Sequence, residues 1–420
     1  MRTGTAMSDL NVVLVGSYPP RRCGIATFTA DLARALSSQP GIKLHVLALE
    51  PRDESYPYGR PVVGRIAQDG LESYLRAMES VRRSRADLIC IQHEYGLWGI
   101  WGSDGLEEDY AVPLIQAAGD LVPRVPVVST LHTVRPYPDE FERQTMAGIV
   151  DSSAATVVMV RMAAMILMDE YGITPNNVVR IPHGVPVVEQ APRRYFKRRL
   201  GLEGRTIIST MGLLDPRKGI EYAIGALPEV VERHPEVLYM IVGETHPEFR
   251  KFAGEGYRND LRQLARDLGV SNHVRFVNQY LSDREVVDYL QASDIYVTPY
   301  LDRTQITSGT LAFAVGSAKA IVSTPYPHAT EALAEGRGLL MELRSSESLA
   351  HCLLLLLDNP ELRKIYESRT AAYGRLDGWP LVGQRYAELF RRVAEGEPLD
   401  DMLAIEPEQL SLRQHQVAIA

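Results

Sequence analysis

The feature that most constrains the fold is a strand–loop–helix pattern that runs through the chain in two successive series. The first series of apolar runs comprises Asn11–Gly16, Lys43–Leu49, Asp87–Gln92, Val125–Leu131, Thr156–Val160 and Val178–Ile181. The second comprises Thr206–Met211, Leu238–Val242, His273–Phe276, Ile295–Val297 and Ala320–Ser323. Helical periodicity fills the gaps, as in Ala26–Ser37 and Ile220–Arg233. Because the apolar runs are continuous rather than alternating, we expect parallel sheets covered by helices on both faces.

Two such series in a chain of 420 residues predict an α/β protein with two doubly wound, Rossmann-like domains that face a cleft. We expect the first domain to span 1–190 and the second 191–380, because the segment 185–197 between them is rich in proline and in polar and charged residues. A last helix over 381–395 should cross back, and the weakly patterned, polar tail over 396–420 is typical of disorder.

Composition excludes several classes of protein. The net charge of -8 argues against binding to nucleic acid or to an anionic membrane surface. Three cysteines are few and widely spaced, which fits a reducing compartment and offers no zinc spacing. No apolar run is long enough for an integral membrane segment, and the N-terminus does not resemble a secretory leader, so we expect a cytoplasmic protein. The sequence is silent on oligomeric state.

Polar residues recur where the strands of the first series end, which is where open α/β sheets bind ligands. Gly24 and Ile25 open a helix whose N-terminus suits an anion, although a plain loop explains them equally well. His93 and Glu94 follow the third strand and could form an acid/base pair, although neighbouring residues of a strand point to opposite sides. His132 is another candidate for the cleft.

His183 could contact a ligand or belong to a hinge. In the second series, Arg217 and Lys218 open a helix after a strand. Two cations at a helix N-terminus are unfavourable unless they bind an anion, so this position indicates a phosphate site. Glu244 ends the next strand and could bind a hydroxyl group or cap its loop.

Taken together, these blocks resemble the retaining GT-B glycosyltransferases of the large family-4 class, over about residues 11–395. The strongest pieces are IPHGV (181–185), GLLDPRKGIEYAIGAL (212–227), LYMIVGETHPE (238–248), HVRFVNQYLSDREVVDYLQASDIYVTPY (273–300) and KAIVSTPYPHATEAL (319–333). The resemblance implies an acceptor-side first domain and a donor-binding second domain. It implies that Lys218 and Arg217 hold the donor phosphates, that His132 approaches the transferred sugar, and that the loop 19–27 closes over the reaction centre. Such enzymes need no metal and no cofactor.

The match breaks at TPYLDRTQITSGTLAFAVG (298–316), where the family carries two glutamates eight positions apart. Gln305 and Phe313 stand at those positions. Glutamine can still bond a sugar hydroxyl, but phenylalanine cannot hold a ribose diol. We expect Ser308, Gly309 and Thr310 to meet the donor phosphate at a helix N-terminus. Sugar contacts are expected from Gln305, Thr307, Glu244, His183, Gly24 and Ile25.

Three functions remain open from the sequence. The preferred one is a metal-independent, retaining hexosyltransferase that uses a nucleotide-sugar, with a glycan or glycoside as acceptor and His132, His93 and Glu94 as catalytic candidates. The second is a nucleotide-independent α-glycoside phosphorylase or hydrolase that acts on a sugar phosphate or glycoside. The third is a non-catalytic sugar-binding protein.

Overall fold

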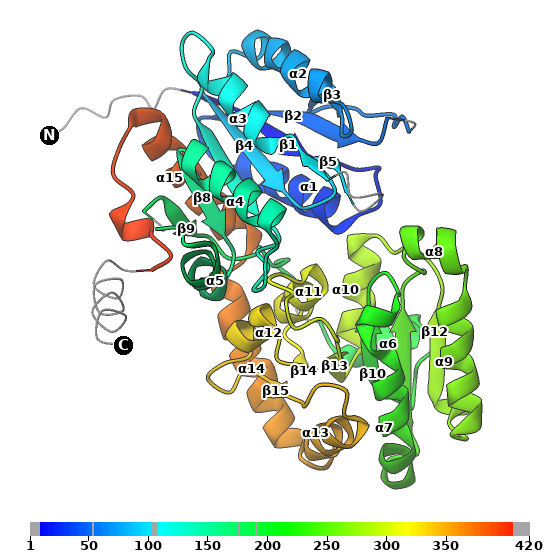
Figure 1. Cartoon of the computed structure of the whole chain (residues 1–420). Helices are drawn as coiled ribbons and strands as arrows, with labels where there is room; N and C mark the ends of the chain where they lie inside the picture. The colour runs from blue at the N-terminus through cyan, green and yellow to red at the C-terminus, as the bar shows by residue number, and fades with distance from the viewer. Residues whose placement is uncertain (1–8, 53, 102–106, 175, 190, 406–420) are drawn as a thin grey trace, which may run out of the picture. The chain divides into compact units, whose positions relative to one another are not determined.

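A computed structural model of the chain describes residues 9–405, except residues 53, 102–106, 175 and 190. It contains two compact units: Met1–Gly184 with Trp379–Ala420 form the first, and Val185–Gly378 form the second. Each unit holds a parallel sheet with helices on its two faces, which confirms the predicted α/β class (Figure 1). Most of the tail predicted for 396–420 lies outside the described residues, whereas Ala404 donates its N–H to the Val178 carbonyl.

The first unit is built on seven strands in the order β3-β2-β1-β4-β7-β8-β9, with every neighbouring pair parallel. The strands are β1 (Leu10–Gly16), β2 (Ile42–Glu50), β3 (Val62–Ala67), β4 (Leu88–His93), β7 (Val127–Leu131), β8 (Ala155–Val158) and β9 (Val178–Arg180). A small antiparallel pair, β5 (Gly99–Ile100) and β6 (Glu108–Asp109), stands apart from this sheet.

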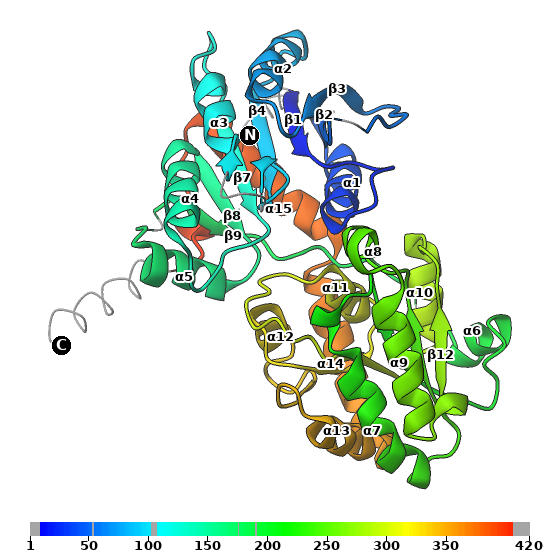
Figure 2. The same ribbon diagram turned by 45° about the vertical axis from the view of Figure 1, so that its right-hand side comes forward.

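Helices cover both faces of this first sheet. They are α1 (Gly24–Ser37), α2 (Leu71–Arg83), α3 (Ala111–Gly119), α4 (Glu140–Ser152), α5 (Arg161–Tyr171) and α15 (Trp379–Glu395), followed by the short 3-10 turn η3 (Asp400–Met402). The last long helix, α15, packs beside α1 (Figure 2) and contributes Tyr386 and Phe390 to the core of this unit. A reciprocal capping box of Asp139 and Glu142 begins α4.

The second unit has six parallel strands in the order β12-β11-β10-β13-β14-β15. These are β10 (Thr206–Met211), β11 (Val237–Val242), β12 (Val274–Val277), β13 (Ile295–Thr298), β14 (Ala320–Ser323) and β15 (Leu339–Leu340). The helices are α6 (Arg193–Arg199), η1 (Pro216–Lys218), α7 (Ile220–Arg233), α8 (Pro247–Ala253), α9 (Gly256–Asp267), η2 (Ser271–His273), α10 (Asp283–Ala292), α11 (Gly309–Gly316), α12 (Pro327–Ala332), α13 (Ser346–Asp358) and α14 (Pro360–Leu376). Helix α13 packs beside α7 (Figure 2).

Strand order locates the functional edge of each unit. In the first sheet β1 lies between β2 and β4, and in the second β10 lies between β11 and β13. The chain reverses its direction of winding at these two points, so the loops after these strands diverge and leave room for a ligand at the carboxyl ends. In the first unit, ligand-binding residues should therefore lie in the loops that follow β1, β4 and β7. In the second unit, they should lie in the loops that follow β10, β11 and β13.

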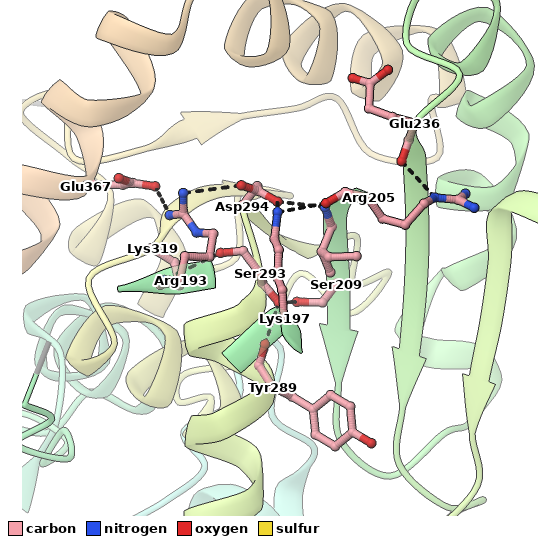
Figure 3. Close-up of polar contacts among 11 residues, drawn as sticks. Arg193, Lys197, Arg205, Ser209, Glu236, Tyr289, Ser293, Asp294, Lys319 and Glu367 are labelled. Carbon is pink, nitrogen blue, oxygen red and sulfur yellow. Dashed lines mark hydrogen bonds and ion pairs between the residues drawn. The ribbon is translucent and has the colours of Figure 1, made fainter. Parts of the chain in front are cut away.

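A buried ionic network holds the opposite, amino-terminal edge of the second sheet (Figure 3). Asp294 accepts a hydrogen bond from Lys197 Nζ at 2.6 Å and from the backbone N–H of Ile207 at 2.7 Å. Arg193 bridges Asp294 at 3.2 Å and Glu367 at 2.6 Å. These contacts tie α6, β10, β13 and α14 together. Truncating one partner of such a pair would leave an uncompensated charge inside the protein. Loss of any one of these side chains should therefore destabilise the second unit.

The sequence-based strand pattern missed β3 and β15. Strand β3 lies at the edge of its sheet and is only half buried, and Gly64 interrupts its apolar pattern. Strand β15 is only two residues long. Edge strands give weaker sequence signals because one side of the ladder faces solvent.

Candidate active site

In the first unit, His132 lies directly after the carboxyl end of β7 and is 4% exposed. Its Nε2 lies 3.0 Å from Oε1 of Gln92, near the end of β4. Because an amide oxygen only accepts hydrogen bonds, Nε2 carries the proton and donates. Burial, followed by the charges of His183 and His93, lowers the pKa of His132 to about 3. The imidazole is therefore neutral at physiological pH and is suited to hydrogen bonding rather than to acid catalysis.

An aromatic cluster surrounds this imidazole. Phe28 of α1 meets the His132 ring edge-on at 4.6 Å between centroids and meets the His183 ring at 5.1 Å. Trp379 of α15 lies 5.2 Å from Phe28. Burial lowers the pKa of His183 to about 4, although its Nδ1 contacts the Gly184 carbonyl at 2.8 Å. The cluster therefore keeps both histidines uncharged.

His93 and Glu94 have different partners from His132. His93 is fully buried, and its Nε2 lies 2.9 Å from Oδ2 of Asp109 in β6. Glu94 is partly exposed and accepts a hydrogen bond from Thr133 Oγ1 at 2.9 Å. Burial raises the pKa of Glu94, and the bond from Thr133 opposes that rise. Glu94 is thus the better placed of the two to exchange a proton with a ligand, whereas His93 anchors the segment after β4 to the sheet.

The predicted loop before α1 is tied to its neighbours. Cys23 caps α1 by accepting the N–H of Ala26 on its sulfur at 3.4 Å. Gly24 has open space around it, because a Cβ there would meet nothing within 4 Å, and Ile25 is partly exposed. Arg21 donates to Gln68 Oε1 at 3.0 Å and so links this loop to the end of β3. The loop lies at the carboxyl edge, as the sequence predicted.

In the second unit, two glycine loops meet at the carboxyl edge. Gly212 follows β10 with a φ of 122°, and Gly243 follows β11 with a φ of 140°. A Cβ on Gly243 would lie 2.0 Å from the Gly212 carbonyl oxygen. Leu214 donates its N–H to the carbonyl of Glu244 at 2.9 Å, which joins the loops further out. Only glycine allows such an approach, so the backbone itself lines this part of the edge.

Arg217 and Lys218, both in η1, have different surroundings. Asp215 caps the turn through the N–H of Arg217 and pairs with its guanidinium at 2.8 Å. Burial would raise the pKa of Asp215, but the bonds and charge of Arg217 outweigh this and lower it. Lys218 Nζ lies 4.0 Å from the centroid of the Tyr300 ring. Within the described part of the chain, no carboxylate pairs directly with Lys218, although its charge helps to lower the pKa of the nearby Asp215, which itself pairs with Arg217.

Helix α11 begins beside these loops. Ser308 caps it by accepting a backbone N–H of the first turn on Oγ at 3.3 Å. Thr310 adjoins Gly212, because a Cβ on that glycine would lie 3.2 Å from Thr310 Cγ2. The first turn of a helix leaves N–H groups without intrahelical partners, and the helix dipole favours an anion there. The structure thus brings the lysine, the glycine loops and this helix N-terminus, including Gly309, to one place.

Two other predicted residues, and the Phe313 that replaces a family glutamate, already have protein partners. Gln305 donates from Nε2 to the Thr307 carbonyl at 2.9 Å. Glu244 accepts a hydrogen bond from Arg250 at 3.2 Å. Phe313 is partly buried and packs against the core of the second unit. Contact of Gln305 or Glu244 with a ligand hydroxyl would therefore compete with bonds that the side chains now make.

The sequence-based reasoning assigned no role to Gln92, Phe28, Tyr300 or Asp215. Gln92 and Tyr300 could have been found from their positions, because each lies at or just after the end of a buried strand. Phe28 looked like an ordinary core residue of an amphipathic helix. Asp215 precedes a proline and two cations, a pattern that can indicate a capped turn.

Comparison with known proteins gives a consistent picture. The model of the glycosyl transferases group 1 matches residues 193–372, and that of glycosyltransferase family 4 matches residues 23–189. The chain belongs to the group 1 glycosyltransferases. Among solved structures, a glycosyltransferase from Rickettsia africae has a TM-score of 0.73 at 13% identity, over 93% of this chain and all of that one. Sucrose-phosphate synthase from Thermosynechococcus elongatus also has a TM-score of 0.73, at 14% identity over 92% and 100%. The fold is therefore GT-B, as the sequence predicted.

Sequence relatives match this chain over only part of their length. Phosphatidyl-myo-inositol mannosyltransferase of Mycolicibacterium smegmatis is 26% identical over 228 residues, 52% of this chain and 53% of that protein. D-inositol 3-phosphate glycosyltransferase of Kineococcus radiotolerans is 24% identical over 299 residues, 64% of this chain and 67% of that protein. The matched region thus spans about half to two thirds of these relatives. In the part of the chain that the structure describes, no helix is long and apolar enough to cross a bilayer.

Proposed function

We propose that this protein is a retaining, metal-independent glycosyltransferase that moves a hexosyl group from a nucleotide-sugar to a carbohydrate or glycoside acceptor. The observation that carries the proposal is the arrangement at the carboxyl edge of the second unit. There, Lys218, the loops of Gly212 and Gly243, and the N-terminus of α11 lie together without a neutralising carboxylate at the lysine. These are the features that bind and stabilise a diphosphate.

In the proposed reaction, the bond between the anomeric carbon and the phosphate oxygen breaks while the acceptor oxygen bonds to the same face of the sugar. Negative charge develops on the departing phosphate, where the Lys218 ammonium and the helix N–H groups stabilise it. The acceptor proton passes to an oxygen of that phosphate, so the proposed path needs no separate base. The products are thus the glycosylated acceptor and the nucleoside diphosphate, which together contain all the atoms and the charge of donor and acceptor.

The first unit contributes groups for the sugar and the acceptor in this proposal. The neutral imidazole of His132 hydrogen-bonds the transferred sugar without competing for the acceptor proton, because its pKa is near 3. Glu94, partly exposed and with a raised pKa, accepts a hydrogen bond from an acceptor hydroxyl in this proposal. In this proposal, further contacts with the sugar come from Gly24, Ile25 and His183. His93 holds the segment after β4 through Asp109.

Names of similar proteins support the donor class. The structure of Anabaena HepE in complex with UDP has a TM-score of 0.70 to this chain, at 16% identity over 91% of this chain and 99% of that one. The matched relatives are named for mannosyl and glycosyl transfer to inositol derivatives. We therefore propose a nucleoside diphosphate as the leaving group, with the ribose held differently from the rest of the family because Phe313 replaces a glutamate.

A two-stage experiment tests this proposal. Calorimetric titration with UDP, GDP and ADP should give saturable binding for at least one of them. The protein is then incubated, with and without EDTA, with the matching α-linked sugar nucleotides and with sugar 1-phosphates. Proton NMR should show an α-linked product that forms equally well in EDTA.

Other outcomes would contradict separate parts of the proposal. A β-linked product would exclude retention, and loss of turnover in EDTA would exclude metal independence. Phosphorolysis or hydrolysis of an α-glycoside without nucleotide binding would identify the nucleotide-independent enzyme. Oligosaccharide binding with no turnover of any donor would identify a sugar-binding protein.

A further inference from the structure

The ammonium of Lys218 rests on an aromatic ring rather than on a carboxylate. Nζ lies 4.0 Å from the centroid of Tyr300, the second residue after β13. An ammonium over a ring face is attracted by the ring quadrupole. Unlike an ion pair with a carboxylate, this contact holds the cation in place without placing a negative charge against it, so the ammonium can still bind an anion. Tyr300 itself is 1% exposed.

Tyr300 is rigidly held by the second unit. Its ring stacks on that of Tyr326, with centroids 5.5 Å apart and planes 16° apart. Its carbonyl oxygen accepts a hydrogen bond from Thr324 Oγ1 at 2.6 Å. Its hydroxyl bonds Thr310 Oγ1 at 2.7 Å, in the first turn of α11. One side chain therefore touches the lysine with its face and the helix N-terminus with its edge.

The backbone that carries Lys218 is latched to the same loop. Leu301 donates its N–H to the Arg217 carbonyl at 2.8 Å. Gly219, with a φ of 62°, lies so close that a Cβ on it would be 2.1 Å from the Pro299 carbonyl oxygen. These contacts hold the turn η1 against the loop 299–301. This leaves the four-carbon stem of the lysine as the flexible part.

We infer that Tyr300 is the positioning residue for Lys218: it fixes the ammonium and aligns it with the N-terminus of α11, so that both act on one leaving phosphate. This inference rests on the proposed function. A lysine side chain loses up to ~2 kcal/mol of rotamer freedom when it is ordered, so a site that orders it beforehand binds its anion more tightly. Tyr300 supplies that order without neutralising the charge.

Binding of the nucleoside diphosphate chosen by titration tests this role in variants of Tyr300 and Lys218. Tyr300→Phe keeps the ring and should keep most of the affinity, whereas Tyr300→Met should weaken binding about fivefold to thirtyfold. In a Lys218→Met background, Tyr300→Met should have little further effect. Tyr386→Met is the matched control, because Tyr386 is a fully buried tyrosine of the first unit whose hydroxyl contacts Thr130.

A second readout does not depend on any donor. Reductive ¹³C-methylation of the few lysines, with Lys218 assigned by Lys218→Arg, should show the Lys218 methyl signal upfield of the others through the Tyr300 ring current. Tyr300→Phe should retain the shift and Tyr300→Met should lose it. If Tyr300→Met does not fold, the signal of the unsubstituted protein decides, and an unshifted Lys218 resonance overturns the inference.

The two proposals fail in distinguishable ways. If the unsubstituted protein binds no nucleoside diphosphate, the proposed function fails, and the methyl shift still decides the contact of Lys218 with Tyr300. If binding depends on Lys218 but is equal in Tyr300→Met and Tyr300→Phe, this inference alone is wrong.

Discussion

Replacing Lys319 with methionine should change how the stability of the second unit depends on pH. Lys319 is 3% exposed, and among the residues that the structure describes its Nζ finds one long hydrogen bond, of 3.5 Å to the Ser293 carbonyl. Burial, followed by the charge of Arg193, lowers the pKa of Lys319 from 10.5 to about 7. The carboxylates of Asp294 and Glu367 oppose this only in part, because Arg193 and Lys197 already pair with them (Figure 3).

The magnitude follows from proton linkage. Between pH 7 and pH 10.5 the unfolded chain holds a proton on Lys319 that the folded chain lacks, so stability rises with pH by up to about 1.4 kcal/mol per pH unit. Below pH 7, Lys319 is protonated in both the folded and the unfolded chain. Its contribution to the free energy of unfolding then becomes constant, at its least favourable value. From pH 7 to pH 9 the rise amounts to about 2 kcal/mol, whereas from pH 6 to pH 7 it is only about 0.3 kcal/mol. In Lys319→Met the rise is absent.

The assay uses the distribution of tryptophans. All three, Trp98, Trp101 and Trp379, lie in the first unit, so tryptophan fluorescence reports its unfolding alone. Urea unfolding is also followed by far-UV circular dichroism, which reports both units, at pH 6, 7, 8 and 9. Comparing the two signals gives the free energy of unfolding of the second unit. The difference in the free energy of unfolding between Lys319→Met and the unsubstituted protein should change by about 2 kcal/mol from pH 7 to pH 9. The exposed Lys364→Met is the control, and a constant difference for Lys319→Met would refute the reasoning.

Other predictions concern the site itself. Gly243→Ala should weaken nucleotide binding by more than about tenfold and lower the melting temperature, because the new Cβ would strike the Gly212 carbonyl; calorimetry and a thermal shift assay that find no change would contradict this. Because the pKa of His132 is about 3, His132 should not titrate near pH 6.5. The pH profile of kcat/KM should therefore have the same shape around pH 6.5 in His132→Gln as in the unsubstituted protein. Asp215→Asn should cost up to about 1 kcal/mol of stability at pH 7 through the lost charge pairing with Arg217, because asparagine still offers an oxygen to cap the turn. The lowered pKa of Asp215 means that this cost should vanish as the pH falls below 3.8, and urea unfolding that shows an unchanged cost there would be inconsistent with the pairing.

Much of the fold could be predicted because parallel strands buried on both faces leave continuous apolar runs. The predicted bounds of β10 (Thr206–Met211) and β14 (Ala320–Ser323) agree with the structure to the residue. The rule that ligands lie at the carboxyl ends of strands directed attention to His132 and Lys218, and the structure places both residues after the carboxyl ends of strands. Half-buried edges, such as β3, were missed because their alternation is weak.

Partners could not be predicted from the sequence, because they depend on three-dimensional contacts. Nothing local indicates that Phe28 meets His132, or that Lys218 lies over Tyr300. His93 and Glu94 are neighbours in sequence, yet one bonds a carboxylate across a loop and the other bonds a threonine after β7. Strand alternation indicated that they would differ, but it could not say which would remain partly exposed.

The central claim is that Lys218 binds the diphosphate of the donor. Calorimetric titration of UDP, GDP and ADP into the unsubstituted protein, Lys218→Met and the surface control Lys364→Met tests it most directly. We expect one nucleotide to bind the unsubstituted protein and the control equally, and to bind Lys218→Met at least about thirtyfold more weakly, since a charge-assisted contact is worth roughly 2 kcal/mol or more. Equal affinity in all three proteins, with Lys218→Met folded, would contradict the account.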